Sequence, residues 1–449
     1  MKRRQRMKRY GRIFLLAILI CGIARFSFSQ EKLVLTLEES ISLALSQNPF
    51  HLASEEKVVT AQYMLKEAQS RLFPTLAAQG LHTLDEKVFE LDLPSFFPGQ
   101  PPQKVKMDFT KDYQFSLGLT FPLYTGGRIL SGFRQAKYNL ESARETVKQS
   151  EGQMVFNVKR AFYGYLLGKE FAEVVEEAVK LAEKHLENVK SLYRAGMASK
   201  FDLLRSEVQL ENLKPRLIKA RNSLKVVELS LKSLLGLELS QPIEVKGGLI
   251  YEPFEPSEEE CLEKALLNRP ELNQLNLQKG IAGEMLKLAR TSRLPTLAIS
   301  GNYNFWADTF SLSGQNWQSF YTVNLVVTVP LFSGFSVSAQ VGQTKSMINE
   351  LELTHKGLVE AVKLEVRQAI LNMKEARESI LSQEKNVEQA QESVRIAELN
   401  FSEGIATTLD VSSAQVALTE AKSNYAQALF DYVMSIAQLQ KAMAIGWKE

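Results

Sequence analysis

Side chains that commonly perform catalysis or bind metals are few in this 449-residue sequence, and they are poorly spaced for either task. No histidines stand at the spacing of a metal site; the four are His51, His82, His185 and His355. The segment 164–169 (GYLLGK) is one residue short of a phosphate-binding loop and falls inside a predicted helix. We therefore expect no catalytic residue, no cofactor and no metal ion, and we predict that the protein is not an enzyme.

Two aspartates, Asp202 and Asp410, stand at equivalent places after a glycine. The segments 195–199 (AGMAS) and 403–407 (EGIAT) each place Gly where a helix can end in a left-handed conformation, followed by Ser or Thr to cap the next helix. Each aspartate comes three residues after that Ser or Thr, which is the spacing of a capping box. The sequence therefore predicts two helical hairpins, and helix capping is one role open to both acids.

Very long helices are predicted on either side of these turns. No proline occurs between Gly334 and Phe401. From Val359 onward, residues that are mostly apolar recur at steps of three and four. A 3.5-residue period is typical of a left-handed coiled coil, and the many alanines in one of its two columns would let neighbouring helices approach closely. Roughly 65 helical residues at 1.5 Å each would form a rod of ~100 Å.

Strict alternation of apolar and small polar residues marks the segments before these helices. It runs through 113–121 (YQFSLGLTF) in the first half of the chain, and through 297–305 and 321–329 in the second. Segments of ~10 residues with one apolar face are the signature of membrane β-barrel strands. A half-buried strand of a soluble sheet alternates in the same way, so both interpretations remain open at this point. After the first 29 residues, no segment has the ~20 consecutive apolar residues of a membrane helix.

The chain repeats itself. The segment 71–76 (RLFPTL) returns at 293–297 (RLPTL), and Pro49 returns as Pro270, 221 residues later. Later landmarks return after 208 residues: 122–126 (PLYTG) as 330–334 (PLFSG), and Gly196 and Asp202 as Gly404 and Asp410. The first half thus has 13 extra residues between its strands, in the proline-rich stretch Leu93–Pro102. We predict a first repeat at 30–235, a linker at 236–268 and a second repeat at 269–449, each repeat consisting of a helix, two strands and a long helical hairpin.

The first 29 residues have the three parts of a secretory signal peptide. They hold eight Lys or Arg and no acid, and an apolar run from Ile13 to Ile23. The segment 27–29 resembles the small-residue cleavage site of such peptides, so cleavage is predicted before Gln30. Lipid attachment at Cys21 is disfavoured because Ile20 stands where a small residue is needed. The mature chain would keep one cysteine, Cys261, and 46 basic against 51 acidic residues. A nucleic-acid partner is not expected, since the basic cluster lies in the leader.

Four strands per chain cannot close a barrel, because the smallest membrane barrels use about eight. Two chains would supply eight strands, whose interior side chains would fill, whereas three would supply twelve and leave a passage. If the strands lie in a membrane, the sequence therefore predicts a trimeric pore.

In combination these features resemble the outer-membrane efflux (TolC-like) family of trimeric channel-tunnels. The resemblance rests on the duplicated halves, the strand ends at 122–127 (PLYTGG) and 330–334, the start of the second repeat at 269–272 (RPEL), and both hairpin turns. It implies a mixed α and β membrane protein whose long antiparallel hairpins form an α-barrel, and whose strands contribute to a trimeric 12-stranded β-barrel. It also implies an outer-membrane location with a tunnel in the periplasm, a periplasmic adaptor (membrane fusion) protein and an inner-membrane pump.

The resemblance also assigns site residues. Asp410 falls on the first of two aspartates that form an acidic ring at the pore gate, and Ser413 falls on the second, which would weaken the ring. Asp202 falls on an aspartate of the interhelical links that keep the tunnel closed, but Ala406 and Phe401 replace its usual basic and tyrosine partners. Contact with the adaptor is expected at the hairpin tips, through Leu192, Ala195, Gly196, Met197, Gly404 and Ile405. Ordinary turn chemistry is the alternative for both glycines.

Two functions remain. The first is a passive exit duct of a tripartite efflux or secretion system, including type I secretion, opened by its adaptor and pump. The second is a trimeric coiled-coil stalk or adhesin anchored by a β-barrel. The sequence does not distinguish small toxic molecules, metal ions and polypeptides as cargo.

Overall fold

A computed structural model describes residues 32–84, 89–93, 103–107, 112–311 and 316–446. The predicted signal peptide, with Cys21, lies outside the described residues, as does the proline-rich stretch apart from Leu93. The chain forms two compact units. Unit 1 takes residues up to Pro49, Met154–Phe254 and Leu371–Gln438, and unit 2 takes Phe50–Gln153, Glu255–Ile370 and the residues from Leu439 onward. Each unit therefore draws on both halves of the sequence.

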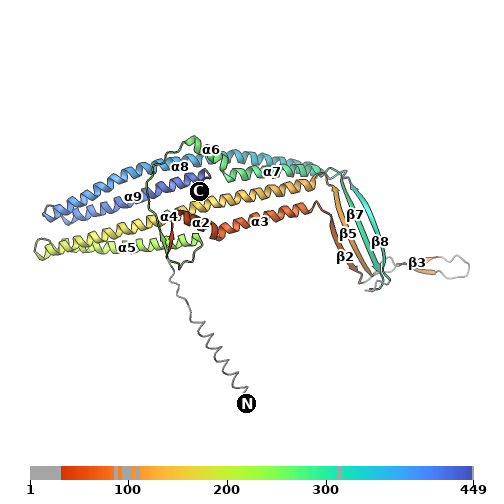
Figure 1. The fold of residues 1–449 in the computed structure, drawn as a ribbon, viewed down its shortest axis with the longest axis horizontal. Helices are drawn as coiled ribbons and strands as arrows, with labels where there is room; N and C mark the ends of the chain where they lie inside the picture. The colour runs from red at the N-terminus through yellow and green to blue at the C-terminus, as the bar shows by residue number, and fades with distance from the viewer. Residues whose placement is uncertain (1–31, 85–88, 94–102, 108–111, 312–315, 447–449) are drawn as a thin grey trace, which may run out of the picture. The chain divides into compact units, whose positions relative to one another are not determined.

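The helices of the two halves match in order and length. These pairs are α2 (Leu37–Gln47) and α6 (Glu258–Asn268) with 11 residues each, α3 (Pro49–Ser70) and α7 (Pro270–Thr291) with 22 each, and α4 (Arg128–Arg194) and α8 (Ser336–Ser402) with 67 each. The last pair is α5 (Lys200–Leu235) with 36 residues and α9 (Thr408–Ala442) with 35 (Figure 1). The predicted hairpins, one very long helix followed by a shorter one, are confirmed.

A small mixed core closes one end of unit 1. The parallel strands β1 (Leu33–Leu35) and β6 (Ile243–Val245) pair here and pack against α2, α4 and α5. The buried apolar cluster consists of Leu35, Ala44, Met154, Val158, Phe162, Leu166, Leu231, Leu235, Ile243 and Val245. The chain after β6 is fastened to α9, because the Tyr432 hydroxyl donates to the Glu252 carbonyl (2.9 Å) and accepts from the Phe254 N–H (3.0 Å). The sequence analysis did not predict this strand pair.

Unit 2 contains a four-stranded antiparallel sheet in the order β2-β5-β7-β8 (Figure 1). Its strands are β2 (Thr75–His82), β5 (Tyr113–Tyr124), β7 (Thr296–Ala307) and β8 (Gln318–Thr328). Directly paired residues share a face, and pairs such as Leu117 with Tyr303 and Tyr303 with Tyr321 place the apolar residues together. This apolar face is not covered within unit 2, since Tyr321 and Val323 are 74% and 72% exposed. The predicted alternation is confirmed.

The loop between β2 and β5 contains a hairpin that the sequence analysis did not predict. Strands β3 (Phe89–Leu93) and β4 (Gln103–Met107) pair antiparallel, with Asp92 opposite Lys104. Opposite charges at paired positions favour this register. The alternation analysis missed the hairpin because its strands are only five residues long and rich in charge.

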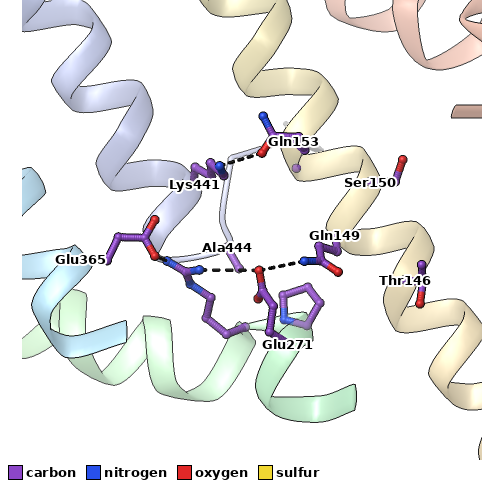
Figure 2. A pocket seen from close by; sticks show the side chains of 11 residues that line it. Thr146, Gln149, Ser150, Gln153, Glu271, Glu365, Lys441 and Ala444 are labelled. Atoms are coloured by element: carbon purple, nitrogen blue, oxygen red, sulfur yellow. Dashed lines mark hydrogen bonds and ion pairs between the residues drawn. The ribbon is translucent and has the colours of Figure 1, made fainter. Parts of the chain in front are cut away.

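Arg269, the first residue of the predicted second repeat, organises a polar pocket in unit 2 (Figure 2). Its buried guanidinium donates to the Ala442 carbonyl (2.7 Å from Nε), and forms ion pairs with Glu365 and Glu271. Beside it Lys441 donates to Gln153 (2.7 Å), and Gln149 donates to Glu271 (3.3 Å). Because the two bases and two acids neutralise one another, we interpret the pocket as a structural junction of α4, α7, α8 and the end of α9.

None of the helices within the described ranges has the length and apolar character needed to cross a membrane.

Candidate functional site

The first hairpin turn joins α4 to α5 in unit 1. After Arg194 the chain turns at Gly196, whose φ of 76° is in the left-handed region that glycine adopts without strain. The Met197 N–H donates to the Leu192 carbonyl (2.8 Å) and the Gly196 N–H to the Tyr193 carbonyl (3.0 Å). These bonds satisfy carbonyls that the helix end would leave without partners.

The second turn, between α8 and α9, has the same geometry. Gly404 also has a φ of 76°, and the Ile405 N–H donates to the Asn400 carbonyl (2.8 Å). At both turns the residue after the glycine is apolar and projects into solvent: Met197 is 76% exposed and Ile405 is 77% exposed. The turn chemistry accounts for the glycines but requires no apolar residue after them.

Both predicted gate aspartates belong to capping boxes within the single chain. The Ser199 hydroxyl donates to Asp202 Oδ2 (2.5 Å), and the Thr407 hydroxyl and N–H both donate to Asp410 Oδ2 (2.7 Å each). Each aspartate N–H donates back to its Ser or Thr oxygen. The bonds from the Thr407 hydroxyl and, second, its N–H hold the pKa of Asp410 below its ordinary value. Capping thus occupies both acids but does not exclude a second role in an assembly.

An open groove between α8 and α9 brings three of the predicted residues together. Ile405, Asp410 and Ser413 line it, along with Glu388 and Glu392 of α8. Arg395 donates to Glu392 (2.7 and 2.8 Å), and these bonds hold the Glu392 pKa below its ordinary value. The sequence analysis missed the two glutamates, although their four-residue spacing places them on one helix face. Of the other predicted residues, Asp202, Leu192 and Ala195–Met197 lie on the first hairpin, and Gly404 lies at the second turn but does not line this groove.

The two hairpins contact each other within unit 1 through Phe401. Its ring packs against the apolar cluster of α4 and α5, which consists of Val179, Ala182, Leu186, Val189, Leu203 and Leu210. The buried His185 ring lies 4.9 Å from Phe401 between centroids, and its Nε2 has no hydrogen-bond partner among the described residues. Burial lowers the His185 pKa, and the charge of Glu398 partly opposes that shift.

Ion pairs supplement this apolar contact. Lys184 of α4 lies 3.7 Å from Glu398 of α8, and Lys422 of α9 donates to Glu177 of α4 at 2.6 Å. In the second hairpin, a cluster built on Ala390, Val394, Ala414, Leu418 and Ala421 receives Leu181 of α4. Within unit 1 the hairpins are therefore linked by Phe401, by Leu181 and by two ion pairs.

No group of three His, Cys, Asp or Glu in the part of the chain that the structure describes is placed to hold a metal ion.

Comparison with known proteins identifies the family. A family model described as "Outer membrane efflux protein" matches residues 40–237 and 261–444, which is most of the chain. The chain belongs to the outer membrane efflux protein family. Both hairpins, both turns and the four-stranded sheet lie within the matched residues.

Relatives of this outer membrane efflux protein are distant in sequence. "Outer membrane protein TolC" of Vibrio cholerae is 23% identical over 327 residues, covering 69% of this chain and 73% of TolC. "Probable efflux pump outer membrane protein TtgC" of Pseudomonas putida is 21% identical over 394 residues, covering 87% of this chain and 78% of TtgC.

Solved structures share the fold. The outer membrane protein VceC of Vibrio cholerae superposes with a TM-score of 0.74 at 16% identity, covering 92% of this chain and 97% of VceC. The CmeC outer membrane channel of Campylobacter jejuni gives a TM-score of 0.75 at 16% identity, covering 92% of this chain and 87% of CmeC. The described structure is therefore the fold of these outer-membrane channels.

Proposed function

We propose that three copies of this chain form the outer-membrane exit duct of a tripartite efflux or secretion system. The duct is passive: it has no catalytic activity of its own, and binding of a periplasmic adaptor and an inner-membrane pump opens it. Family membership supports the efflux role, and the fold shared with outer-membrane channels supports the architecture.

The sheet is the observation that carries the proposal. Its edge strands, β2 and β8, each have one strand neighbour within the described residues, and its apolar face is exposed. Unpaired strand edges pair readily with another chain, and a large exposed apolar face needs lipid or protein to cover it. Three copies joined edge to edge would supply twelve strands, enclosing a passage and turning the apolar faces toward lipid.

In this arrangement the sequence comprises a signal peptide (1–29) and two repeats (30–235 and 269–449) joined by the linker 236–268, and the end of that linker forms α6, the counterpart of α2 in the first repeat. The match of helix lengths between the halves supports the duplication. The hairpin tips, with the exposed Met197 and Ile405, would contact the adaptor.

The gate would be formed by Asp410 from each of the three chains, with Ser413 beside it and Asp202 restraining the first hairpin. Three carboxylates near one axis would repel one another and attract cations. The repulsion would raise the Asp410 pKa in the trimer, opposing the Thr407 hydrogen bonds that lower it in one chain. The closed duct is therefore expected to be cation-selective.

The test is planar-bilayer recording of the purified mature protein, after light scattering in detergent establishes a trimer. We expect a cation-selective conductance that a trivalent cation blocks modestly. Asp410→Ala should weaken selectivity and block, whereas Asp202→Ala should mainly raise the frequency of spontaneous opening. Absence of any conductance would favour a solid stalk and contradict the duct. Unchanged selectivity and block in Asp410→Ala would leave the duct but remove Asp410 from its gate.

A further inference from the structure

The face of the sheet opposite the apolar one is made mostly of polar and small residues; besides the apolar Leu81 and Val326, the main exception is aromatic. Strand pairing places these residues in rows across β2, β5, β7 and β8, and the rows contain Gln79, Gln114, Ser116, Asn302, Asn304, Thr322 and Asn324. The exception lies toward the β7–β8 connection, where Trp306 and Phe320 belong to this polar face. Trp306 occupies the row of Leu81, Gln114 and Gln318, and Phe320 occupies the next row, with Gln79, Ser116 and Asn304.

The two aromatic rings form a defined pair. Their centroids lie 5.1 Å apart with an interplanar angle of 65°, an edge-to-face arrangement. The Trp306 indole N–H donates to Gln318 Oε1 at 2.9 Å, which fixes the ring orientation and satisfies its only polar group. Phe320 remains 48% exposed, so within the chain the pair presents an aromatic surface rather than filling a core.

The pair borders an open-sided hollow of about 390 Å³ that is also lined by polar amides and by the apolar residues Leu81, Phe115 and Phe305. The lining includes Gln79, Gln114 and Asn304 as well as Trp306, Phe320 and Leu81. A small number of hydrogen-bonding groups beside an aromatic wall is the usual composition of a small-molecule site. The hollow is of the size that such sites have, roughly 300–1,000 Å³.

Charge narrows the ligand class. None of the four strands of the sheet contains Asp, Glu, Lys or Arg. The hollow can therefore stack a flat ring and exchange hydrogen bonds with it, but it presents no fixed charge for a metal ion or a highly charged polypeptide.

We propose that Trp306 and Phe320 form a contact site for uncharged, planar aromatic molecules that carry hydrogen-bonding groups. The inference rests on the proposed function, in which this polar face lines the duct and each trimer holds three such sites. Cargo of this class would be retained briefly at the wall of the sheet as it passes. The aromatic residues of the apolar face, such as Tyr303 and Tyr321, lie on the other side of the same strands and take no part.

The test uses reconstituted trimers of the mature chain in planar bilayers, with 7-amino-4-methylcoumarin as an uncharged planar probe. Binding of the probe in the open duct is measured from the concentration dependence of current fluctuations. Two double variants are matched: Trp306→Leu with Phe320→Leu on the polar face, and Tyr303→Leu with Tyr321→Leu on the apolar face. Each removes one aromatic ring from β7 and one from β8 and keeps an apolar side chain.

We expect the Trp306/Phe320 variant to bind the probe about two- to tenfold more weakly than wild type, the range of a lost aromatic contact. The Tyr303/Tyr321 variant should bind like wild type, and glucose, which has no flat ring, should not distinguish the channels. Equal binding in all three channels, or equal loss in both variants, would overturn the inference. A wild type that conducts no salt current would instead contradict the proposed function. If the double variant yields no trimer, Trp306→Leu alone gives the same comparison.

Discussion

The two hairpin turns have nearly the same backbone, but their aromatic residues lie in different environments. Tyr193 and Phe401 occupy equivalent positions, each three residues before the turn glycine. Tyr193 is 40% exposed, with the Lys200 ammonium 5.7 Å from its ring centroid, whereas Phe401 packs into the cluster of the opposite hairpin beside His185. The backbone of the turn, which depends on local chemistry, is thus the same in both hairpins, whereas the surroundings of the two equivalent aromatic residues differ.

The largest effect should come from removing the ring that links the hairpins. Phe401→Ala is expected to weaken the contact between them by about 2 kcal/mol, less than the roughly 3–5 kcal/mol of a fully buried Phe, because Phe401 is partly exposed. Backbone amides near both turns should exchange hydrogen faster. The matched control is Tyr193→Ala, which should leave exchange in the second hairpin unchanged. Equal effects of the two substitutions would show that the turns are not asymmetric.

An intermediate effect is expected at the caps, where the two turns should respond alike. Ser199→Ala and Thr407→Ala each remove a capping box and should each cost about 1 kcal/mol of local helix stability. Hydrogen exchange at the first turns of α5 and α9 measures this loss. Thr407→Ser, which keeps the capping hydroxyl, serves as the control. Thr407→Ala should also raise the Asp410 pKa toward its ordinary value, because the hydroxyl is the main cause of the lowering. A large difference between the two sites would mean that neighbouring contacts, not the caps, hold one of the helices.

The smallest effect should be a pH dependence of the stability of the contact between the two hairpins at His185 and Phe401, called the link below. Burial lowers its pKa in the folded chain from the ordinary 6.5, so the unfolded hairpin binds the proton more readily. The link should therefore be fully stable above about pH 6.5 and lose stability as pH falls through the lowered pKa of the folded chain. The charge of Glu398 moderates this lowering of the pKa, and Glu398 itself pairs with Lys184.

His185→Phe should keep the ring contact with Phe401 and abolish this part of the pH dependence. Hydrogen exchange of the α4–α8 contact, measured between pH 5 and 8 on wild type and variant, tests it. Identical pH profiles for both proteins would show that another group titrates.

Features set by neighbouring residues were predictable from the sequence. The glycine turns, both capping boxes and the strand alternation depend on residues a few positions apart, and all are present as expected. Three-residue strands whose partners lie about 210 residues away, as in β1 and β6, leave no local pattern. The Arg269 junction was recognised only as a repeat landmark, because its acceptor on Ala442 is 173 residues distant.

In the candidate site too, local features were predictable from the sequence and long-range contacts were not. The sequence placed Asp202 and Asp410 at helix starts but could not show that Phe401 would cross to the other hairpin. The gate that we propose would need groups from three chains, so neither the sequence pattern nor the fold of one chain determines it. The aromatic pair was not predicted because Trp306 and Phe320 occupy positions where the alternation of the strands leads one to expect polar residues.

The discontinuous build of the two units constrains how the protein can mature during export. Unit 1 needs Leu371–Gln438, and unit 2 needs the residues from Leu439 onward, including the Ala442 carbonyl that receives Arg269 and the Lys441 ammonium that reaches Gln153. A chain threaded into the periplasm from its N-terminus therefore emerges with both units incomplete until the second half follows, although α4 and α5 already pack on each other within the first half. Exposed apolar faces and open strand edges favour aggregation, so the interval before the last segment arrives is the one in which the chain is most exposed to it.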